Sequence, residues 1–268
     1  MGHMFQGAKK FNQDVSKWDV SEVTDMEIMF YGAENFNQDL SNWHVAKVTT
    51  MKMMFEKSIF NQIISNWDVS KVTTMESMFK DNEAFNSDIS NWDVSEVTSM
   101  EGMFHSALVF NQDLSQWVTS KVTDTSYMFA RAFEFNGDIS NWDVSKVTDM
   151  EGMFRDAGSF NLNNSNWEVS EVTNMKSMFE GAAKFDQDIS KWNVAKVENM
   201  ESMFYAAESF NRDISKWEVS RVTNMESMFP RAWIFAQDIS KWNVSKVTSN
   251  DNFDGGKDDS NLNWDDAH

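Results

Sequence analysis

The 268-residue chain contains no cysteine, a single proline and only four histidines. Without cysteine, disulfides and thiolate metal sites are excluded, and the sequence is compatible with any redox compartment. No run approaches the roughly 18 apolar residues that span a membrane, so direct membrane insertion is not expected of this chain. The histidines (His3, His44, His105 and His268) are isolated, so no set of nucleophile, base and orienting residue is suggested. We therefore expect that the protein is not an enzyme.

Positive charge is also scarce. The 23 lysines and arginines face 42 aspartates and glutamates, which gives a formal net charge of −19. Nucleic acid needs lysine and arginine to neutralise its phosphates, so it is not an expected partner. The same charge disfavours unaided binding to anionic lipid. Neither a glycine-rich phosphate loop nor a His/Cys metal spacing occurs, and no cofactor is expected.

One short sequence motif, by contrast, is repeated many times along the chain. FNQDVSKWDV, which starts at Phe11, returns with small changes, for example as FNSDISNWDV from Phe85. Ten tryptophans mark the copies at steps of 25 residues, with one step of 24 between Trp43 and Trp67. They are Trp18, Trp43, Trp67, Trp92, Trp117, Trp142, Trp167, Trp192, Trp217 and Trp242. A fixed period in this range indicates a solenoid, in which each unit buries its apolar face against its neighbours. No linker interrupts the period, which predicts one domain over residues 4–253.

Both ends depart from the repeat. Residues 1–3 are interpreted as a cloning remnant, and Met4-Phe5 matches Met29-Phe30, so the array is expected to start in the middle of a repeat. Residues 254–268 are polar and acidic, which predicts a C-terminal cap or tail with one partial repeat echo at Trp264.

Within one copy, the apolar spacing changes from that of a strand to that of a helix. Trp92 and Val94 alternate with polar residues, which predicts a short strand with one buried face. Thr98-Ser99-Met100-Glu101 has the form of a capping box, in which the threonine oxygen would satisfy an amide at a helix start. The following Met100, Met103, Phe104 and Ala107 are spaced like one face of a short helix. The sequence therefore predicts an α/β repeat solenoid with one short parallel strand and one short helix per coil.

The full pattern, I-S-x-W-D-V-S-x-V-T-x-M-x-x-M-F-x-x-A-x-x-F-N, resembles the BspA-like group of leucine-rich-repeat surface proteins. The likeness is to the 25-residue tandem repeats of mycoplasma-type surface lipoproteins and covers residues 4–253. This resemblance implies a right-handed leucine-rich-repeat-like array at the cell surface or secreted. It also implies a role in adhesion or partner recognition, because the scaffold is shared while targets differ.

Four kinds of repeated residue are interpreted as scaffold: tryptophan, methionine, asparagine and aspartate. The tryptophans are expected to stack as a core ladder rather than as exposed rings for sugars, with the methionines as core filler. The asparagine after each phenylalanine is expected to hydrogen-bond the backbone of an adjacent coil. The aspartate two residues further on is expected to cap turn amides, and a row of calcium ions bridging these carboxylates is the alternative. These aspartates are Asp14, Asp39, Asp88, Asp113, Asp138, Asp188, Asp213 and Asp238.

Function is expected where the copies vary. Residues beside each tryptophan point away from the buried side and would pave a continuous outer face of the sheet, the usual binding surface of a solenoid. The candidate residues are Asp19, His44, Asp68, Asp93, Asp143, Glu168, Asn193, Glu218 and Asn243, together with Lys191, Lys216 and Lys241 near the end of the array. The predicted function is a surface binding or adhesion module for a protein or glycan on a host or neighbouring cell. A structural spacer, a calcium-binding solenoid and a merely solvated charged face remain the alternatives.

Overall fold

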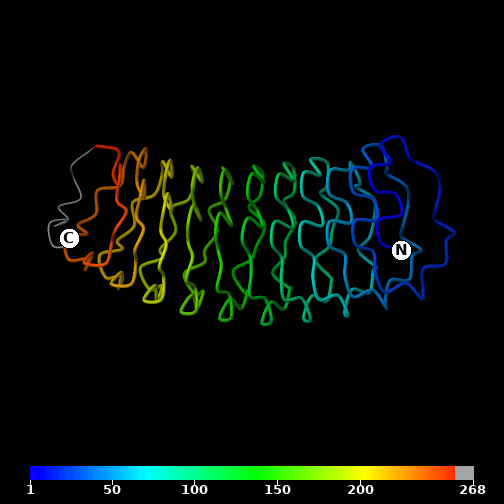
Figure 1. Cartoon of the computed structure of the whole chain (residues 1–268), viewed down its shortest axis with the longest axis horizontal. Helices are drawn as coiled ribbons and strands as arrows, with labels where there is room; N and C mark the ends of the chain where they lie inside the picture. The colour runs from blue at the N-terminus through cyan, green and yellow to red at the C-terminus, as the bar shows by residue number, and fades with distance from the viewer. Residues whose placement is uncertain (257–268) are drawn as a thin grey trace.

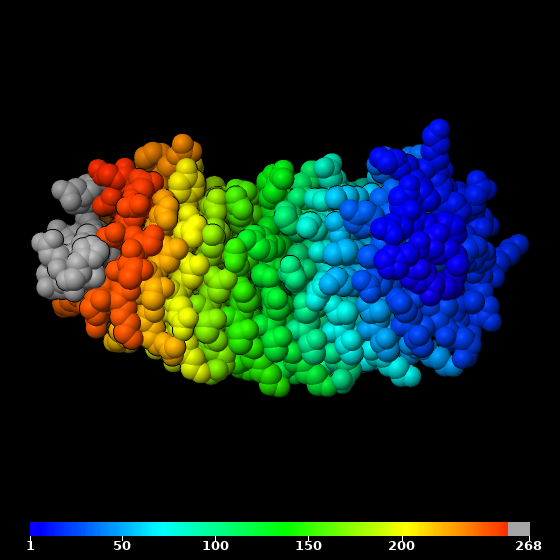
Figure 2. Space-filling view, viewed as in Figure 1, coloured from blue at the N-terminus to red at the C-terminus, as the bar shows by residue number. Residues whose placement is uncertain are grey.

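The computed structural model describes residues 1–256 as a stack of coils that follow one another along the long axis (Figure 1). The first coils and the last described coils lie at opposite ends of the stack (Figure 1). In the space-filling view the colour changes steadily from one end of the rod to the other, so successive parts of the chain lie side by side along it (Figure 2). The solenoid predicted from the repeat period is confirmed. Residues 257–268, including Trp264 and most of the predicted acidic cap, lie outside the described part.

Regular secondary structure is limited to isolated parallel β-bridges between successive coils. Residues 1–256 contain no helix and no strand of more than one paired position. Nine isolated parallel bridges join equivalent positions of successive coils, from Asp25–Thr50 to Asn224–Ser249. Because helix is absent from this part, nothing in it has the length and apolar character of a membrane-spanning helix. The α/β detail of the prediction is therefore wrong, although the repeat architecture is right.

The predicted strand at Trp92–Val94 is replaced by turns. Burial alternates as expected, with Trp92 and Val94 buried and Asp93 exposed. However, the Trp92 amide donates to the Ile89 carbonyl at 3.1 Å and the Val97 amide to the Val94 carbonyl at 2.9 Å. From residue 89 to 97, no backbone amide of this copy donates to a neighbouring coil. Alternation of buried and exposed side chains thus arose here without a strand ladder.

The predicted helix at Met100–Ala107 is a run of turns. The amides of Met100, Gly102 and Phe104 donate forward to the next coil at 2.8–3.0 Å, whereas those of Met103 and Ala107 reach back three residues. The φ angles of Gly102 and Ser106 are +58° and +57°, which is left-handed and incompatible with a continuous helix. A two-turn helix is costly to nucleate. The next coil offers partners to the amides of Met100, Gly102 and Phe104 instead.

The threonine column does not form capping boxes. The Thr98 hydroxyl donates to the Thr73 carbonyl of the preceding coil at 3.1 Å, and the Thr98 amide donates to the same oxygen at 2.9 Å. The same hydroxyl contact recurs from Thr49 to Thr248 with Glu198 as the one non-threonine acceptor. The threonines therefore tie neighbouring coils together, which corrects the prediction of helix caps.

The core is a set of aromatic and methionine ladders. Trp92 is 2% exposed and stacks on Trp67 with ring centroids 6.4 Å apart. Its indole N–H donates to the Ile64 carbonyl of the preceding coil at 3.0 Å. Phe104 stacks on Phe110 of its own coil at 3.9 Å and on Phe129 of the next at 5.6 Å. The core ladder of tryptophans is confirmed, with Trp18 in the first coil the exposed member at 36%.

Buried polar contacts compensate for the missing residue in the one short coil, which contains Phe55 and Phe60. Where one residue is missing, the Ser58 hydroxyl donates to the Phe55 carbonyl at 2.8 Å. The side-chain amide of Asn82 in the next coil donates to the Phe60 carbonyl at 3.0 Å and to the Ser58 hydroxyl at 3.3 Å. Phe55 and Phe60 still stack at 4.1 Å, so the aromatic ladder passes through this coil unbroken.

Candidate functional site

The aspartate column is occupied by local turn capping. The Asp88 carboxylate accepts the Ser90 amide at 2.9 Å, and that backbone hydrogen bond, followed by the one from the Ser90 hydroxyl, lowers the pKa of Asp88. Asp14, Asp39, Asp113, Asp138, Asp188, Asp213 and Asp238 make the same contact with the serine two residues on. Backbone capping is therefore confirmed for this column. Within residues 1–256, no group of three or more acidic or histidine side chains is placed to hold a metal ion.

The asparagine column links each coil to the one before it. The Asn86 amide nitrogen of the backbone donates to the side-chain oxygen of Asn61 at 2.9 Å, and Asn111 repeats the contact with Asn86 at 2.9 Å. The series continues through Asp186, whose carboxylate accepts the Asn211 amide at 3.2 Å. The predicted ladder between coils is confirmed, although the side chains of Asn61, Asn86 and Asn111 lie at the surface rather than inside.

Acid should weaken the fold below about pH 4. The folded pKa values of Asp88, Asp138 and Asp143 lie below their ordinary 3.8, so the stability they provide is present above that value and lost as pH falls through the lowered pKa. Burial raises the pKa of Glu101 and Asp149, so these two groups act in the opposite direction and stability rises as pH falls through their raised values. We expect a shallow rise in Tm below neutral pH and a steep fall below about pH 4.

The measurement is Tm by circular dichroism across this pH range. A double variant, Asp88→Asn with Asp138→Asn, keeps an oxygen for each serine amide but cannot titrate. The fall of its Tm below about pH 4 should be shallower than that of the wild type. An equal fall of Tm in the two proteins would contradict the assignment of acid-sensitive stability to the aspartate column.

All twelve candidate binding residues lie on one exposed face. Each of these residues is exposed. The tryptophan that directly precedes or follows it in the sequence is buried in every copy after the first. We call this surface the tryptophan face and define it by Asp19, His44, Asp68, Asp93, Asp143, Glu168, Asn193, Glu218, Asn243, Lys191, Lys216 and Lys241. The structure thus brings the residues of the candidate site into continuous rows along the rod.

Several residues of the tryptophan face also cap their own turns. The Asp93 carboxylate accepts the Ser95 amide at 3.0 Å, and Asp68 and Asp143 do the same for Ser70 and Ser145. Asparagine fills the role elsewhere, since the Asn193 side-chain oxygen accepts the Ala195 amide at 3.2 Å. The substitution Asp93→Ser would therefore remove a turn acceptor as well as a charge. Aspartate to asparagine is the substitution that changes charge and keeps this contact.

The tryptophan face is hollowed between coils. One depression of about 330 Å³ lies beside Trp43 and His44 and extends to Asp68 of the next coil. A second, of about 500 Å³, lies beside Trp92 and Asp93 and extends to Val118. Val118 stands where most copies have an acidic or amide residue and is 55% exposed. The face therefore offers different local chemistry from coil to coil.

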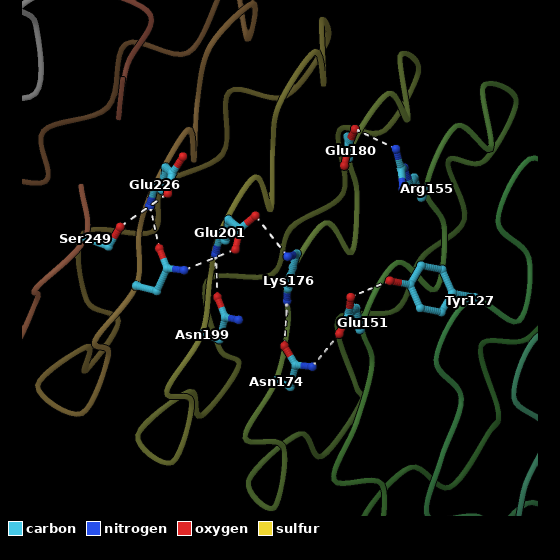
Figure 3. Close-up of polar contacts among 11 residues, drawn as sticks. Tyr127, Glu151, Arg155, Asn174, Lys176, Glu180, Asn199, Glu201, Glu226 and Ser249 are labelled. Atoms are coloured by element: carbon cyan, nitrogen blue, oxygen red, sulfur yellow. Dashed lines mark hydrogen bonds and ion pairs between the residues drawn. The ribbon is translucent and has the colours of Figure 1, made fainter. Parts of the chain in front are cut away.

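A second polar row, which sequence reasoning missed, follows the parallel bridges (Figure 3). The Asn174 side-chain amide donates to Glu151 of the preceding coil at 2.9 Å, and Lys176 pairs with Glu201 of the following coil at 3.0 Å (Figure 3). The hydrogen bond from Lys176 to Glu201 raises the pKa of that lysine. The sequence predicts a capping-box role for Glu101 in the same column, whereas the contacts of Glu151 and Glu201 show that glutamates of this column connect coils.

These contacts define a class of protein: a solenoid of stacked coils whose fixed columns form the core and whose variable columns form exposed rows. The chain belongs to the family described as "Mycoplasma protein of unknown function, DUF285", whose model matches residues 1–67, 57–167 and 158–264. The resemblance to mycoplasma-type tandem repeats is therefore confirmed. The family description itself gives no activity.

Comparison with solved structures finds distant likenesses. A leucine-rich repeat protein from Bacteroides ovatus is 10% identical, with 93% of this chain and 74% of that chain covered and a TM-score of 0.45. The functional domain of InlJ from Listeria monocytogenes, which includes a cysteine ladder, is 12% identical over 84% of this chain and 68% of its own, with a TM-score of 0.16. At these TM-scores neither is a guide to the fold, which rests on the contacts between coils described above. No curated protein matches the chain.

Proposed function

We propose that the protein is a non-enzymatic cell-surface binding module that presents the tryptophan face to a protein or glycan on a host or neighbouring cell. One observation carries the proposal. Exposed side chains that vary between copies are held in register by core columns that hardly vary, as in solenoids that use one extended surface for recognition. The family match supports a surface repeat protein.

Binding should depend on the negative charges in the middle of the tryptophan face. The test is saturable binding of the purified protein to a panel of matrix proteins, mucins and glycans, with and without calcium. In the triple variant Asp68→Asn, Asp93→Asn and Asp143→Asn, we expect affinity to fall about tenfold or more, because each removed charge at an interface is commonly worth a large part of a kcal/mol or more. The Tm should change little, since asparagine already caps the equivalent turn at Asn193.

A matched control makes the same number of aspartate-to-asparagine changes outside the tryptophan face. Asp88→Asn, Asp113→Asn and Asp138→Asn remove three charges from the neighbouring capping column and keep its acceptors. Both triple variants have the same net charge, so loss of binding in the first and not in the second locates the site. Equal loss in both would indicate a general effect of charge. No binding to any member of the panel, in either buffer, would favour the structural spacer instead.

A further inference from the structure

One place on the array departs from the repeat in several columns at once. Ala130 occupies a position filled by His105 in the coil before and Arg155 in the coil after. Because Ala130 is small and 1% exposed, a depression of about 540 Å³ opens over it. Tyr127, Arg131, Phe133 and Asp156 complete its lining with His105 and Arg155. We call it the Tyr127 pocket.

The aromatic wall of the Tyr127 pocket is held in place. The Tyr127 hydroxyl donates to the Glu151 carboxylate of the next coil (Figure 3). Its ring lies over Gly152, where a Cβ would stand 2.6 Å from the ring carbons, so only glycine leaves room for it. The His105 ring stacks on the other side, with centroids 6.3 Å apart. Phe133, which is 42% exposed, adds a second aromatic surface at the rim.

The charge of the pocket is opposite to that of the chain. Arg131 and Arg155 line it against one carboxylate, Asp156, whereas the whole chain carries −19. Within residues 1–256, the Arg131 guanidinium makes no hydrogen bond or ion pair. Arg155 makes one ion pair, with Glu180 at 3.4 Å, which leaves further N–H donors available. Burial, and then nearby cations including Lys80 and Arg131, lower the pKa of His105, consistent with a locally positive site.

We propose that the Tyr127 pocket binds a carboxylate-bearing sugar, with the guanidinium groups of Arg131 and Arg155 taking the carboxylate and the exposed ring of Phe133 packing against the sugar ring. Guanidinium groups match carboxylates in a bidentate geometry. A volume of about 540 Å³ lies in the usual range of small-molecule sites. The pocket is separate from the tryptophan face, and the inference does not rest on the function proposed for that face.

An acidic peptide fits this place less well. Peptides commonly add as a strand to a free backbone edge. Here the Tyr127 amide already donates to the Glu151 carbonyl at 2.7 Å and the Arg131 amide to the Arg155 carbonyl at 2.6 Å. The backbone beside the pocket is therefore occupied by contacts between coils, and side chains alone are left for recognition.

The test is calorimetric titration of the whole chain, in low salt, with N-acetylneuraminic acid, glucuronic acid, glucose and a hexaglutamate peptide. We expect saturable binding of at least one acidic sugar, with glucose at least tenfold weaker. Arg131→Gly should weaken that binding at least tenfold without loss of Tm, because Arg131 has a φ of +58° and the same position is glycine at Gly32 and Gly181. Arg231→Gly is the matched control, since Arg231 occupies the same column with a φ of +62° four coils away.

A second variant fills the depression rather than removing charge. Ala130→Tyr places a side chain there that the same column already holds at Tyr31 and Tyr205, and it should abolish binding. Binding of one acidic sugar and not the other would support the proposal and identify the source of the carboxylate. Absence of binding by both, equal binding of glucose, equal loss in the two arginine variants, or hexaglutamate binding with the same dependence on Arg131 would overturn it. The triple aspartate variant of the tryptophan face should bind the sugar as the wild type does, so the two proposals fail separately.

Discussion

Trp92→Ala should lower the free energy of unfolding by about 3–5 kcal/mol, the usual cost of truncating a large aromatic side chain in a core. Trp92 is 2% exposed, stacks on Trp67 and donates its indole N–H to the carbonyl of Ile64. The substitution therefore removes packing within the coil and a contact between two coils. In a solenoid the interface between neighbours is the main source of stability, so the loss cannot be shared with distant parts of the chain. Urea unfolding followed by tryptophan fluorescence and circular dichroism measures it.

Two further variants test the contribution of the indole hydrogen bond and the effect of position in the array. Trp92→Phe keeps an aromatic ring but loses the indole donor, and because the Ile64 carbonyl still accepts the Trp67 amide at 3.1 Å, we expect a loss of about 1–2 kcal/mol. Trp18→Ala is the positional control, since Trp18 belongs to the first coil and is 36% exposed. It should cost much less than Trp92→Ala. Comparable losses at Trp18 and Trp92 would refute the account of the tryptophans as staples between coils.

Asn164→Ile should raise the free energy of unfolding by about 1–3 kcal/mol, the cost of leaving a buried amide without hydrogen-bond partners. Asn164 is 1% exposed, and neither its side-chain oxygen nor its nitrogen has a partner within residues 1–256. The equivalent positions in the coils on either side are Ile139 and Ile189, so the site is shaped for isoleucine. Its backbone carbonyl, which accepts the Trp192 indole at 3.1 Å, is unaffected by the change.

Thermal and urea unfolding of three chains test this prediction. Asn164→Ala removes the same two unpaired atoms but leaves a void, so its stability should fall below that of Asn164→Ile. The turn next to it stays capped in all three, because the Asn163 side chain accepts the Ser165 amide at 3.0 Å. A less stable Asn164→Ile would mean that the amide has a stabilising role.

The architecture and the core could be predicted from the sequence, and the secondary structure could not. A period of 25 residues shows that each unit meets neighbours of similar sequence, and the alternation around Trp92 shows which side is buried. The spacing of Met100, Met103 and Phe104 fits a helix and a chain of tight turns equally well, since both return a side chain to one face after three or four residues. The deciding feature is the left-handed backbone at Gly102 and Ser106. Other copies place Tyr127 or Arg131 at these positions, so residue type alone does not reveal it.

The candidate site, too, could be predicted from the sequence only in part. Exposure of the tryptophan face followed from the repeat alone, because it needs only the alternation of buried and exposed positions. The double role of Asp93 did not, since its contact with Ser95 depends on a turn that the predicted strand would not contain. The Tyr127 pocket could not be found from any one column. It arises where a small residue, Ala130, lies beside Tyr127 and Arg131 of its own coil and next to Arg155 of the following coil.

Many hydrogen bonds between the described coils join a column of one copy to the same column of the next, as the threonine contact of Thr98 with Thr73 illustrates. Loss or duplication of one whole repeat in the gene would thus preserve the contacts of these repeated columns at the new junction, although contacts specific to one pair of coils, such as that of Tyr127 with Glu151, would change. Length is in that sense a freely adjustable trait: recombination between copies could lengthen or shorten the rod while the fold is preserved. The coil around Ser58 marks the other case, in which a copy one residue shorter than the others is accompanied by buried polar residues in two successive copies.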